Sequence, residues 1–469
     1  MALLFALSIL CAVALSSSCA SREAEHPVIC CLGVLLCTAL SPALAFVFRV
    51  WVLRRLIRDP QNARQYMRVY LISERSLAVV WFTTACLLVF ACHWPAVVRC
   101  NWNLFEVVLL DELLILVPIA LPLFLMKAVQ YDIEYWARLY AIPNHTRRTD
   151  RWRFAWEQSR VYIGIAIVPI LLLTTCWDLS RVFLPRLVEG GWEWIVLLLP
   201  LVILFAAFPL LLRVMWPTTE LPDRSLHSQL LRMAKRAQLS VRNVIVWHAP
   251  SHAPNAAVTG VLPWLTYVFL TDELVKQFDD DEIEATFAHE LGHIGCHHNV
   301  LRMFALLLPA ALLGLLVNIG ASGVSPVPNA HTNLVAQPGI CLFVTMFYLV
   351  FVFGWFCRQL EHQADVFACR LLMRAQDAVT QDTLAQDTVR ATASARYQSV
   401  LQKLSAVAQP DRREWLHPSL NQRSRFLTQA LANSAFYRRF ERRLAAARLL
   451  VTSLTLSSFG ISVWFTITS

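Results

Sequence analysis

Residues 279–299 read DDDEIEATFAHELGHIGCHHN, with an acidic start and a histidine-rich end. The acidic start favours a helix N-terminus, and we expect the helix to continue to about Asn299. On such a helix His289 and His293 lie one turn apart on one face, so both can offer a ring nitrogen to one metal ion, with Glu290 beside them. Composition predicts only about 0.01 chance matches to this pattern per chain. The plainer interpretation is a histidine pair on a helix surface.

The residues that follow exclude one common ligand set. A catalytic zinc site needs a third protein ligand and one open position. A third histidine six residues after His293 would complete such a site, but Asn299 occupies that position. His297 and His298 lie too close along the same expected helix to complete the site easily. The third ligand is therefore expected from another part of the chain.

The run RQLEHQAD at residues 358–365 offers the best third ligand. Glu361 would supply a carboxylate oxygen, and His362 is the alternative ligand. Asp365 lies one helical turn after Glu361, where it could hydrogen-bond a ligand histidine. The plainer interpretation of this run is an ordinary acidic face of a helix.

The composition is that of an integral membrane protein. The chain has 469 residues, of which 57% are hydrophobic and 16% are charged, and its mean hydropathy is +0.51. The apolar residues collect in long blocks, and a bilayer core needs about 20 apolar residues per helical span. The expected spans are 2–20, 28–52, 77–95, 104–126, 161–183, 192–216, 300–320 and 337–357, while 447–468 is either a further span or an interfacial helix.

Basic residues predict the orientation of these spans. Loop 53–76 carries six arginines and loop 127–160 carries seven basic residues, whereas the alternate loops are nearly empty. By the positive-inside rule every basic segment, including 217–299 and 358–446, then faces the cytoplasm. The net charge of +9 follows this pattern, so nucleic acid is not an expected partner. Thirteen cysteines without a Cys-x-x-Cys spacing predict neither a disulfide framework nor a thiolate metal site.

The spans divide the chain into five expected regions. These are a membrane region of about six spans at 1–216, the first half of a zinc domain at 217–299, a two-span hairpin at 300–357, the second half at 358–446, and a possible final span at 447–469. A hairpin returns the chain to the side from which it started, so the two halves can build one domain. The expected fold class is mostly α, with multi-pass membrane helices and a small α+β domain.

Periodicity predicts the elements of that small domain. Residues 225–239 have the apolar spacing of a helix, and 241–247 and 265–270 are predicted as strands. The stretch 372–410, rich in Ala, Gln, Thr and Asp, is expected to be solvated helix and connecting loop. The edge of a strand such as 264–270 could bind an extended peptide by strand addition.

Four short motifs together resemble a known family. They are NAAVTG at 255–260, TDEL at 271–274, HELGH at 289–293, and a glutamate followed four residues later by aspartate at 361–365. With them the chain resembles the zinc peptidases that include the CAAX prenyl proteases and the HtpX-type proteases, over about 225–300 and 355–430. The resemblance implies a minigluzincin-like α+β domain with two spans between the zinc helix and the third ligand.

The resemblance also implies a role for each matching residue. His289, His293 and Glu361 would bind one zinc ion per chain, and Glu290 would be the general base. Asp365 would orient a zinc ligand.

Three further residues receive roles in the same way. Asn255 would begin a strand or loop that positions the substrate backbone. His417, followed by proline, and Arg423 resemble the C-terminal motif of the family, in which they lie near the site and support the substrate or the oxyanion. Without the family, His417 is equally well a turn histidine before proline.

These observations predict a zinc-dependent membrane metalloendopeptidase that acts on membrane-associated or misfolded polypeptides, either HtpX-like or CAAX-processing-like. It would lie in a bacterial inner membrane or an ER-type membrane with its peptidase domain on the cytoplasmic side. The alternatives are a sensor-type zinc protease that cuts one signalling partner and a non-enzymatic membrane protein. Cleavage inside the bilayer is disfavoured, because the zinc helix begins with too many charges to span it. Residues 2–20 are expected to be an uncleaved span rather than a signal peptide.

Overall fold

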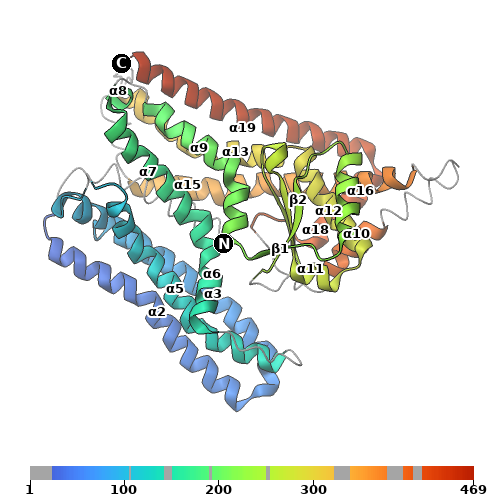
Figure 1. Ribbon diagram of the computed structural model, residues 1–469, viewed down its shortest axis with the longest axis horizontal. Coiled ribbons are helices and arrows are strands. Elements are labelled where there is room, and N and C mark those ends of the chain that lie inside the picture. Colours follow the sequence, from blue (N-terminus) through green and yellow to red (C-terminus); the bar gives the residue numbers. More distant parts are fainter. Residues whose placement is uncertain are drawn as a thin grey trace. The chain divides into compact units, whose positions relative to one another are not determined.

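The computed structural model describes residues 24–104, 107–141, 150–189, 193–249, 254–321, 338–377, 395–404 and 415–468. The chain forms two compact units, Met1–Leu201 and Val202–Ser469. Both are built mainly from helices, and the small sheet belongs to the second (Figure 1). The expected span at 2–20 lies outside the described residues.

The described part of the first unit is entirely helical. Its elements are α2 (Pro27–Arg58), η1 (Pro60–Asn62), α3 (Ala63–Phe90), α4 (Trp94–Ala96), η2 (Val97–Asn101), α5 (Leu110–Ala141), α6 (Arg151–Tyr162), η3 (Ile163–Ile167), α7 (Val168–Phe183) and α8 (Pro185–Glu189), and α9 (Glu193–Met215) continues into the second unit. Helix α2 packs against α3 and α5. The indole of Trp81, buried between these helices, donates a hydrogen bond to the carbonyl of Ile119 at 2.8 Å.

Acidic residues inside the expected span 104–126 are paired rather than isolated. Asp111 and Glu112 lie in the first turn of α5 and are buried. The guanidinium of Arg99 donates to Asp111 at 2.7 Å and to Glu112 at 3.2 Å. A buried charge is costly unless it is paired, so this contact explains how the apolar helix tolerates the two carboxylates.

The second unit combines long helices with a four-stranded sheet. Its elements are β1 (Thr218–Glu220), α10 (Arg224–Arg236), β2 (Asn243–Trp247), β3 (Ala256–Thr259), η4 (Pro263–Leu265), β4 (Tyr267–Thr271), α11 (Asp272–Gln277), α12 (Asp280–Gly295), α13 (His298–Ala321), α15 (Pro338–Phe347), η5 (Tyr348–Phe353), α16 (Gly354–Asp377), α18 (Leu420–Ala432) and α19 (Ser434–Thr468). Residues 395–404 form a further helix. Buried side chains of α10, the sheet, α12 and α16 form one hydrophobic core.

The strand order is β1-β2-β4-β3, with β2 and β4 parallel and the outer pairs antiparallel. Every residue of β4 is buried, because strands lie on both sides of it. The prediction that 264–270 offers a free edge is therefore wrong, and among the described strands β3 forms that edge. Strand pairing depends on contacts distant in sequence, which local patterns of Val and Phe do not reveal.

Helix α12 begins as predicted and ends earlier than predicted. Asp279 caps it, with its side chain accepting from the backbone of Glu282 while the Glu282 carboxylate accepts from the backbone of Asp279. The helix ends at Gly295 instead of near Asn299, and His297 has a left-handed backbone with φ of 55°. The chain therefore turns before α13, so His297 and His298 do not continue the helix that carries His289.

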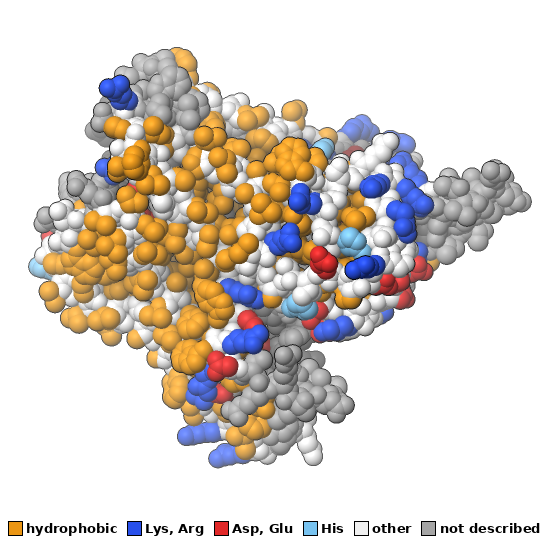
Figure 2. Space-filling view, in the orientation of Figure 1, with side chains coloured by type: hydrophobic (Ala, Val, Ile, Leu, Met, Phe, Trp, Pro, Cys, Tyr) orange, Lys and Arg blue, Asp and Glu red, His pale blue; other side chains and the backbone are white. Residues whose placement is uncertain are grey.

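Seven described helices are long and apolar enough to cross a membrane. They cover Pro27–Arg58, Ile72–Phe90, Leu110–Trp136, Leu198–Met215, His298–Ile319, Phe343–Arg374 and Ser434–Phe465. The expected span at 161–183 is helical, as η3 and α7, but is not among the seven. Hydrophobic side chains cover the long helices, whereas Lys and Arg side chains gather over the sheet-bearing part of the second unit (Figure 2). The predicted fold class, mostly α with multi-pass membrane helices and a small α+β part, is confirmed.

Candidate metal centre and active site

Three side chains from two helices meet inside the second unit. His289 and His293 project from α12, and Glu361 projects from α16. The Nε2 atoms of the two imidazoles lie 3.2 Å apart, and each lies 3.4 Å from an oxygen of the Glu361 carboxylate. All three side chains are buried, with Glu361 only 1% exposed.

These spacings fit the ligand shell of a zinc ion. Zinc binds imidazole nitrogen and carboxylate oxygen at about 2.0–2.2 Å in tetrahedral geometry, so neighbouring ligand atoms lie about 3.3–3.5 Å apart. The observed distances of 3.2, 3.4 and 3.4 Å are close to this spacing, with His289 nearest Oε2 and His293 nearest Oε1 of Glu361. Two nitrogens and one oxygen, with a fourth position left for water or substrate, form the donor set typical of catalytic zinc.

Close packing of α12 on α16 brings the ligands together. Gly292 faces Ala364, and a Cβ atom added at Gly292 would lie 3.0 Å from the Cα atom and 3.1 Å from the carbonyl oxygen of Ala364. A larger residue at this position would therefore hold the helices apart. The glycine inside the His-Glu-Leu-Gly-His motif allows the approach that carries Glu361 to the two histidines.

Three side chains surround the Nδ1 atom of His289. Asp365 lies 3.1 Å from it and accepts hydrogen bonds from the hydroxyl of Tyr397 at 2.7 Å and from Arg423 at 2.6 and 3.0 Å. Burial, together with the Asp365 carboxylate, raises the pKa of the Tyr397 phenol well above its usual range, so the hydroxyl stays protonated and donates. An Nδ1–H directed at Asp365 leaves the Nε2 lone pair of His289 free for a metal.

His293 has a different partner. Its Nδ1 atom lies 2.8 Å from Nδ1 of His298, whose Nε2 lies 3.0 Å from the amide oxygen of Gln363. An amide oxygen only accepts, so His298 donates to Gln363 through Nε2 and accepts at Nδ1 from His293. Burial holds the pKa of His293 well below its usual range, which keeps this imidazole neutral with its Nε2 lone pair directed into the site.

Helix α19 sets the orientation of Gln363. The amide nitrogen of Gln363 donates to both oxygens of Glu441, at 2.8 and 3.0 Å, and Arg448 donates to the amide oxygen. These contacts turn the oxygen of Gln363 toward His298. Glu441 and Arg448 of α19 thus orient Gln363, and Gln363 orients His298. His298 in turn determines which ring nitrogen of His293 carries the proton.

Glu361 is held by two basic side chains. Arg302, from the second turn of α13, donates to one carboxylate oxygen at 2.7 Å, and Nδ1 of His417 lies 2.9 Å from the other. The indole of Trp415 donates to the carbonyl of Val350 at 2.8 Å, and the Trp415 carbonyl accepts from Arg358 at 2.9 Å. Trp415 thus fastens the chain two residues before His417 against the start of α16.

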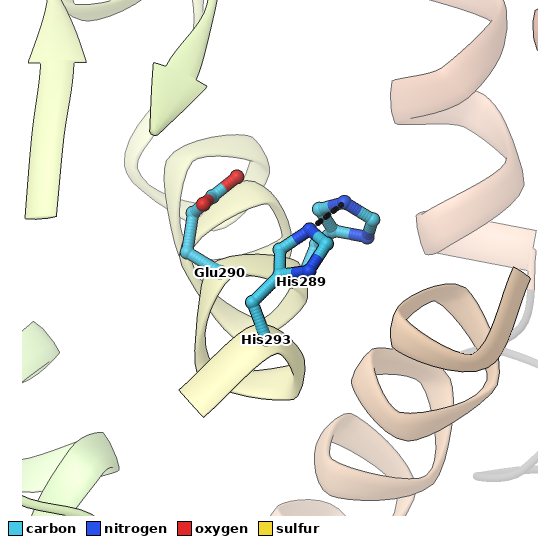
Figure 3. A group of neighbouring side chains, drawn as sticks. All are labelled: His289, Glu290 and His293. Carbon is cyan, nitrogen blue, oxygen red and sulfur yellow. Dashed lines mark hydrogen bonds between the residues drawn. The ribbon is translucent and has the colours of Figure 1, made fainter. Parts of the chain in front are cut away.

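Glu290 stands next to the two imidazoles on α12 (Figure 3), and its carboxylate, His289 and His293 each offer an atom within 4.8 Å of the others. The Glu290 side chain lies in an enclosed environment, and this burial raises the pKa of its carboxyl above its usual range. A carboxylate with a raised pKa is a better proton acceptor near neutral pH than an exposed one.

A cavity of about 220 Å³ opens on these residues. Its lining includes Asn255 and the first residues of the edge strand β3, and Val400, Leu401 and Leu404 of the helix at 395–404. The cavity lining includes His289, Glu290, His293, Arg302, Glu361, Tyr397, His417 and Arg423. The backbone of Asn255 is fixed by hydrogen bonds to Thr271, with its N–H donating to the Thr271 hydroxyl at 2.8 Å. Of the residues predicted for the site, Asp365 lies behind His289 and does not line the cavity; the alternative ligand His362 does not line it either, and its ring stacks on Phe426.

Sequence reasoning missed three residues of this site. Tyr397 lies in a stretch expected to be solvated, although Tyr397, Val400, Leu401 and Leu404 have the spacing of one apolar helix face. Arg302 is a charge in the first turns of an apolar span, which is a signal of function in itself. His298 was set aside because it was expected to continue α12.

Comparisons with known proteins agree with this site. Residues 220–431 match the model of Peptidase family M48. "Protease HtpX homolog" of Campylobacter concisus is 27% identical over 130 residues, which are 28% of this chain and 44% of that protein. "Protease HtpX" of Sodalis glossinidius is 26% identical over 168 residues, which are 32% of this chain and 55% of that protein. The chain thus spans about half the length of the curated relatives it matches.

Among solved structures, the chain is similar to "Crystal Structure of S. mikatae Ste24p", with a TM-score of 0.45 and 18% identity over 87% of this chain and 100% of that one. The family match takes in every residue that lines the cavity. Residues 220–431 are therefore similar to Peptidase family M48, in agreement with the four motifs.

Proposed function

We propose that the chain is a zinc-dependent membrane metalloendopeptidase. The observation that carries the proposal is the cluster of His289, His293 and Glu361, whose nitrogen and oxygen atoms lie 3.2–3.4 Å from one another across the site and line a cavity that also contains Glu290. The match to Peptidase family M48 supports a peptidase, and the seven apolar helices support a membrane enzyme. One zinc ion per chain accounts for the donor set.

The chain's own residues account for the remaining chemistry. Zinc at this position would polarise the scissile carbonyl and make hydroxide available near neutral pH. Glu290 takes a proton from the attacking water and returns it to the leaving amine, and such proton transfer contributes about 10²–10⁴-fold to the rate.

His417 and Arg423 divide the supporting roles between them. His417, half exposed in the cavity wall, can donate to the oxygen on which negative charge develops. The guanidinium of Arg423 is engaged by both oxygens of Asp365. Arg423 therefore acts mainly by holding Asp365 and, through it, His289.

The edge strand supports a mode of substrate binding. The residues 255–258 line the cavity, and β3 pairs with β4 on only one of its sides among the described strands. An extended peptide can add to the free side of β3 through backbone hydrogen bonds. Its scissile bond would then pass between Glu290 and the metal ligands, with Asn255 at the end of the paired segment.

The proposed substrates are membrane-associated or misfolded polypeptides, in an HtpX-like or a CAAX-processing-like reaction. The match to the two named HtpX relatives covers only about half of each relative's length. It therefore does not decide between the two substrate classes, and both stay within the proposal. The basic segments support a peptidase part that faces the cytoplasm.

A comparison of two substitutions tests the activity. The purified chain in detergent is incubated with zinc and fluorescein-labelled casein, and a farnesylated CAAX peptide is tested in parallel. Glu290→Gln should keep its zinc and lose about 10²–10⁴-fold in cleavage rate, because the proton acceptor is removed. Glu220→Gln, on the exposed strand β1, is the control and should cleave like the wild type. Equal cleavage by Glu290→Gln and wild type at equal zinc content would refute the proposed chemistry.

A further inference from the structure

The loop between β3 and β4, residues 260–265, carries an unusual surface. Trp264 is 62% exposed and Val261 is 37% exposed. Among the described residues of 217–297, 358–377, 395–404 and 415–446, these two are the only large aliphatic or aromatic hydrophobic side chains on the surface. An apolar group that is confined to one loop of an otherwise polar surface indicates contact with a partner.

The exposure of Trp264 is built into a tightly bonded turn. The backbone of Leu265 and the hydroxyl of Thr266 both donate to the carbonyl of Leu262, at 2.9 Å each. Gly260 has φ of 124°, and a Cβ atom added there would lie 2.7 Å from the carbonyl oxygen of Leu265. Only glycine fits this turn, which holds Trp264 outward instead of letting it fold onto the sheet.

The loop is fastened to the beginning of a membrane-type helix. The side chain of Asn299 donates to the carbonyl of Gly260 at 3.1 Å. Asn299 lies in the first turn of α13, and the apolar segment His298–Ile319 of this helix is long enough to cross a bilayer. The loop therefore lies beside the first turn of a helix that is long and apolar enough to be a span.

Basic residues accompany the apolar side chains. Arg242 is exposed and donates to the carbonyl of Trp264 at 3.2 Å. Helix α10 ends with Lys235 and Arg236, and the residues directly after it line a cavity of about 190 Å³ together with Val261. Tryptophan concentrates at membrane–water interfaces, and cationic side chains close to the membrane surface attract lipid phosphate.

We propose that residues 260–265 are an interfacial membrane anchor of the sheet. Trp264 and Val261 lie at the level of the headgroups and the first acyl carbons, and Arg242 binds lipid phosphate. The partner is the bilayer surface that surrounds the end of α13. Because β3 runs directly into this loop, the anchor holds the edge strand at a fixed height above the membrane.

Photo-crosslinking of the full chain in lipid nanodiscs tests the anchor. The photoreactive amino acid p-benzoylphenylalanine is introduced in place of Trp264 in one sample and in place of Lys276 in the other. Lys276 is the matched control, because it is exposed and lies on α11, which follows the opposite end of β4. Irradiation should give a lipid adduct at position 264 and none at position 276, as read by mass spectrometry.

Either of two other results overturns the proposal. In the first, position 264 gives no lipid adduct, whether or not it crosslinks to residues of Met1–Leu201; in the second, both positions give lipid adducts equally. A second measurement avoids the substitution of a bulky group. Brominated phospholipid should quench the emission that Trp264 contributes, obtained as the difference between wild type and Trp264→Phe, and no quenching of this difference would contradict a tryptophan at the interface.

Discussion

The two ligand histidines are oriented by chemically different partners. His289 directs its Nδ1 at the Asp365 carboxylate, which is itself held by Tyr397 and Arg423. His293 instead donates to a second imidazole, that of His298. A carboxylate raises the basicity of a ligand imidazole, whereas a neutral imidazole fixes its tautomer with less added charge. The site therefore combines one strongly and one weakly polarised ligand.

Removing the acceptor for His293 should weaken metal binding. We expect His298→Asn to lower zinc affinity about 10–100-fold, because asparagine is too short to bridge His293 and Gln363. Zinc affinity is measured by competition with a fluorescent chelator. The control is His297→Asn, an identical change at an exposed position whose left-handed backbone asparagine tolerates. If both variants bind zinc equally, His298 does not position the ligand.

At this scale the sequence predicted the residues that share one motif and missed those brought in by the fold. His289, Glu290 and His293 follow from their spacing on one helix. Tyr397 reaches His289 from more than a hundred residues away, and no local pattern links the two. His298 was missed for a backbone reason. Helical spacing placed it on the same helix as His289, but the left-handed backbone of His297 turns the chain before His298.

Among the helices, the pairing of α12 with α16 matters most for the site. Ile283, the first buried residue of α12, directly follows the capping box of Asp279 and Glu282, and Gly292 allows the close approach to Ala364 farther along. A glycine inside a helix ordinarily costs about 1 kcal/mol relative to alanine. The close contact that the glycine permits offsets this cost.

Adding a methyl group to the contact between α12 and α16 should destabilise the site. Gly292→Ala adds a methyl group 3.0–3.2 Å from atoms of Ala364, and overpacking of this kind costs about 1–3 kcal/mol. We expect a lower melting temperature and weaker zinc retention. Gly314→Ala on α13 is the control, because a Cβ atom added at Gly314 would lie 3.9 Å from the Ser462 hydroxyl, an ordinary contact distance. A melting temperature for Gly292→Ala at or above that of the control would contradict this account of the packing.

The elements of the second unit were predictable where local signals act alone. The start of α12 follows from its capping box, and α10 and β2 lie close to the residues predicted for them. The position of β4 inside the sheet was not predictable, because strand order depends on tertiary pairing. The end of α12 was not predicted either: Gly295 is its last residue, but the left-handed position that follows, where glycine is usual, is held by His297.

For the whole molecule, the distribution of arginines makes a prediction about orientation. The segments 217–299 and 358–446 should both face the cytoplasm, with the connection 322–337 on the other side. A protease-cleavage tag inserted after residue 385 should be cut in inverted membrane vesicles and protected in intact cells. A tag after residue 330 should behave in the opposite way. Cleavage of both tags from one side would contradict a hairpin between the two halves of the peptidase part.

The membrane character of the chain was predictable because apolar blocks carry their own signal. Eight of the nine expected spans fall on described residues, and seven of these correspond to helices of the required length and apolarity. The exception, 161–183, is formed by the end of α6, η3 and α7. The charged pairs inside the first unit were not predictable, because Arg99 and its two carboxylates are joined only by the packing of separate elements.

The central claim is that one metal ion is held jointly by α12 and α16. The most direct test is the zinc content of the purified full chain, measured by mass spectrometry for wild type, Glu361→Gln and Glu290→Gln. The account predicts one zinc per chain in wild type and Glu290→Gln, and a large loss in Glu361→Gln, because an amide is a poor zinc ligand. Full zinc content in Glu361→Gln, or none in the wild type, would contradict it.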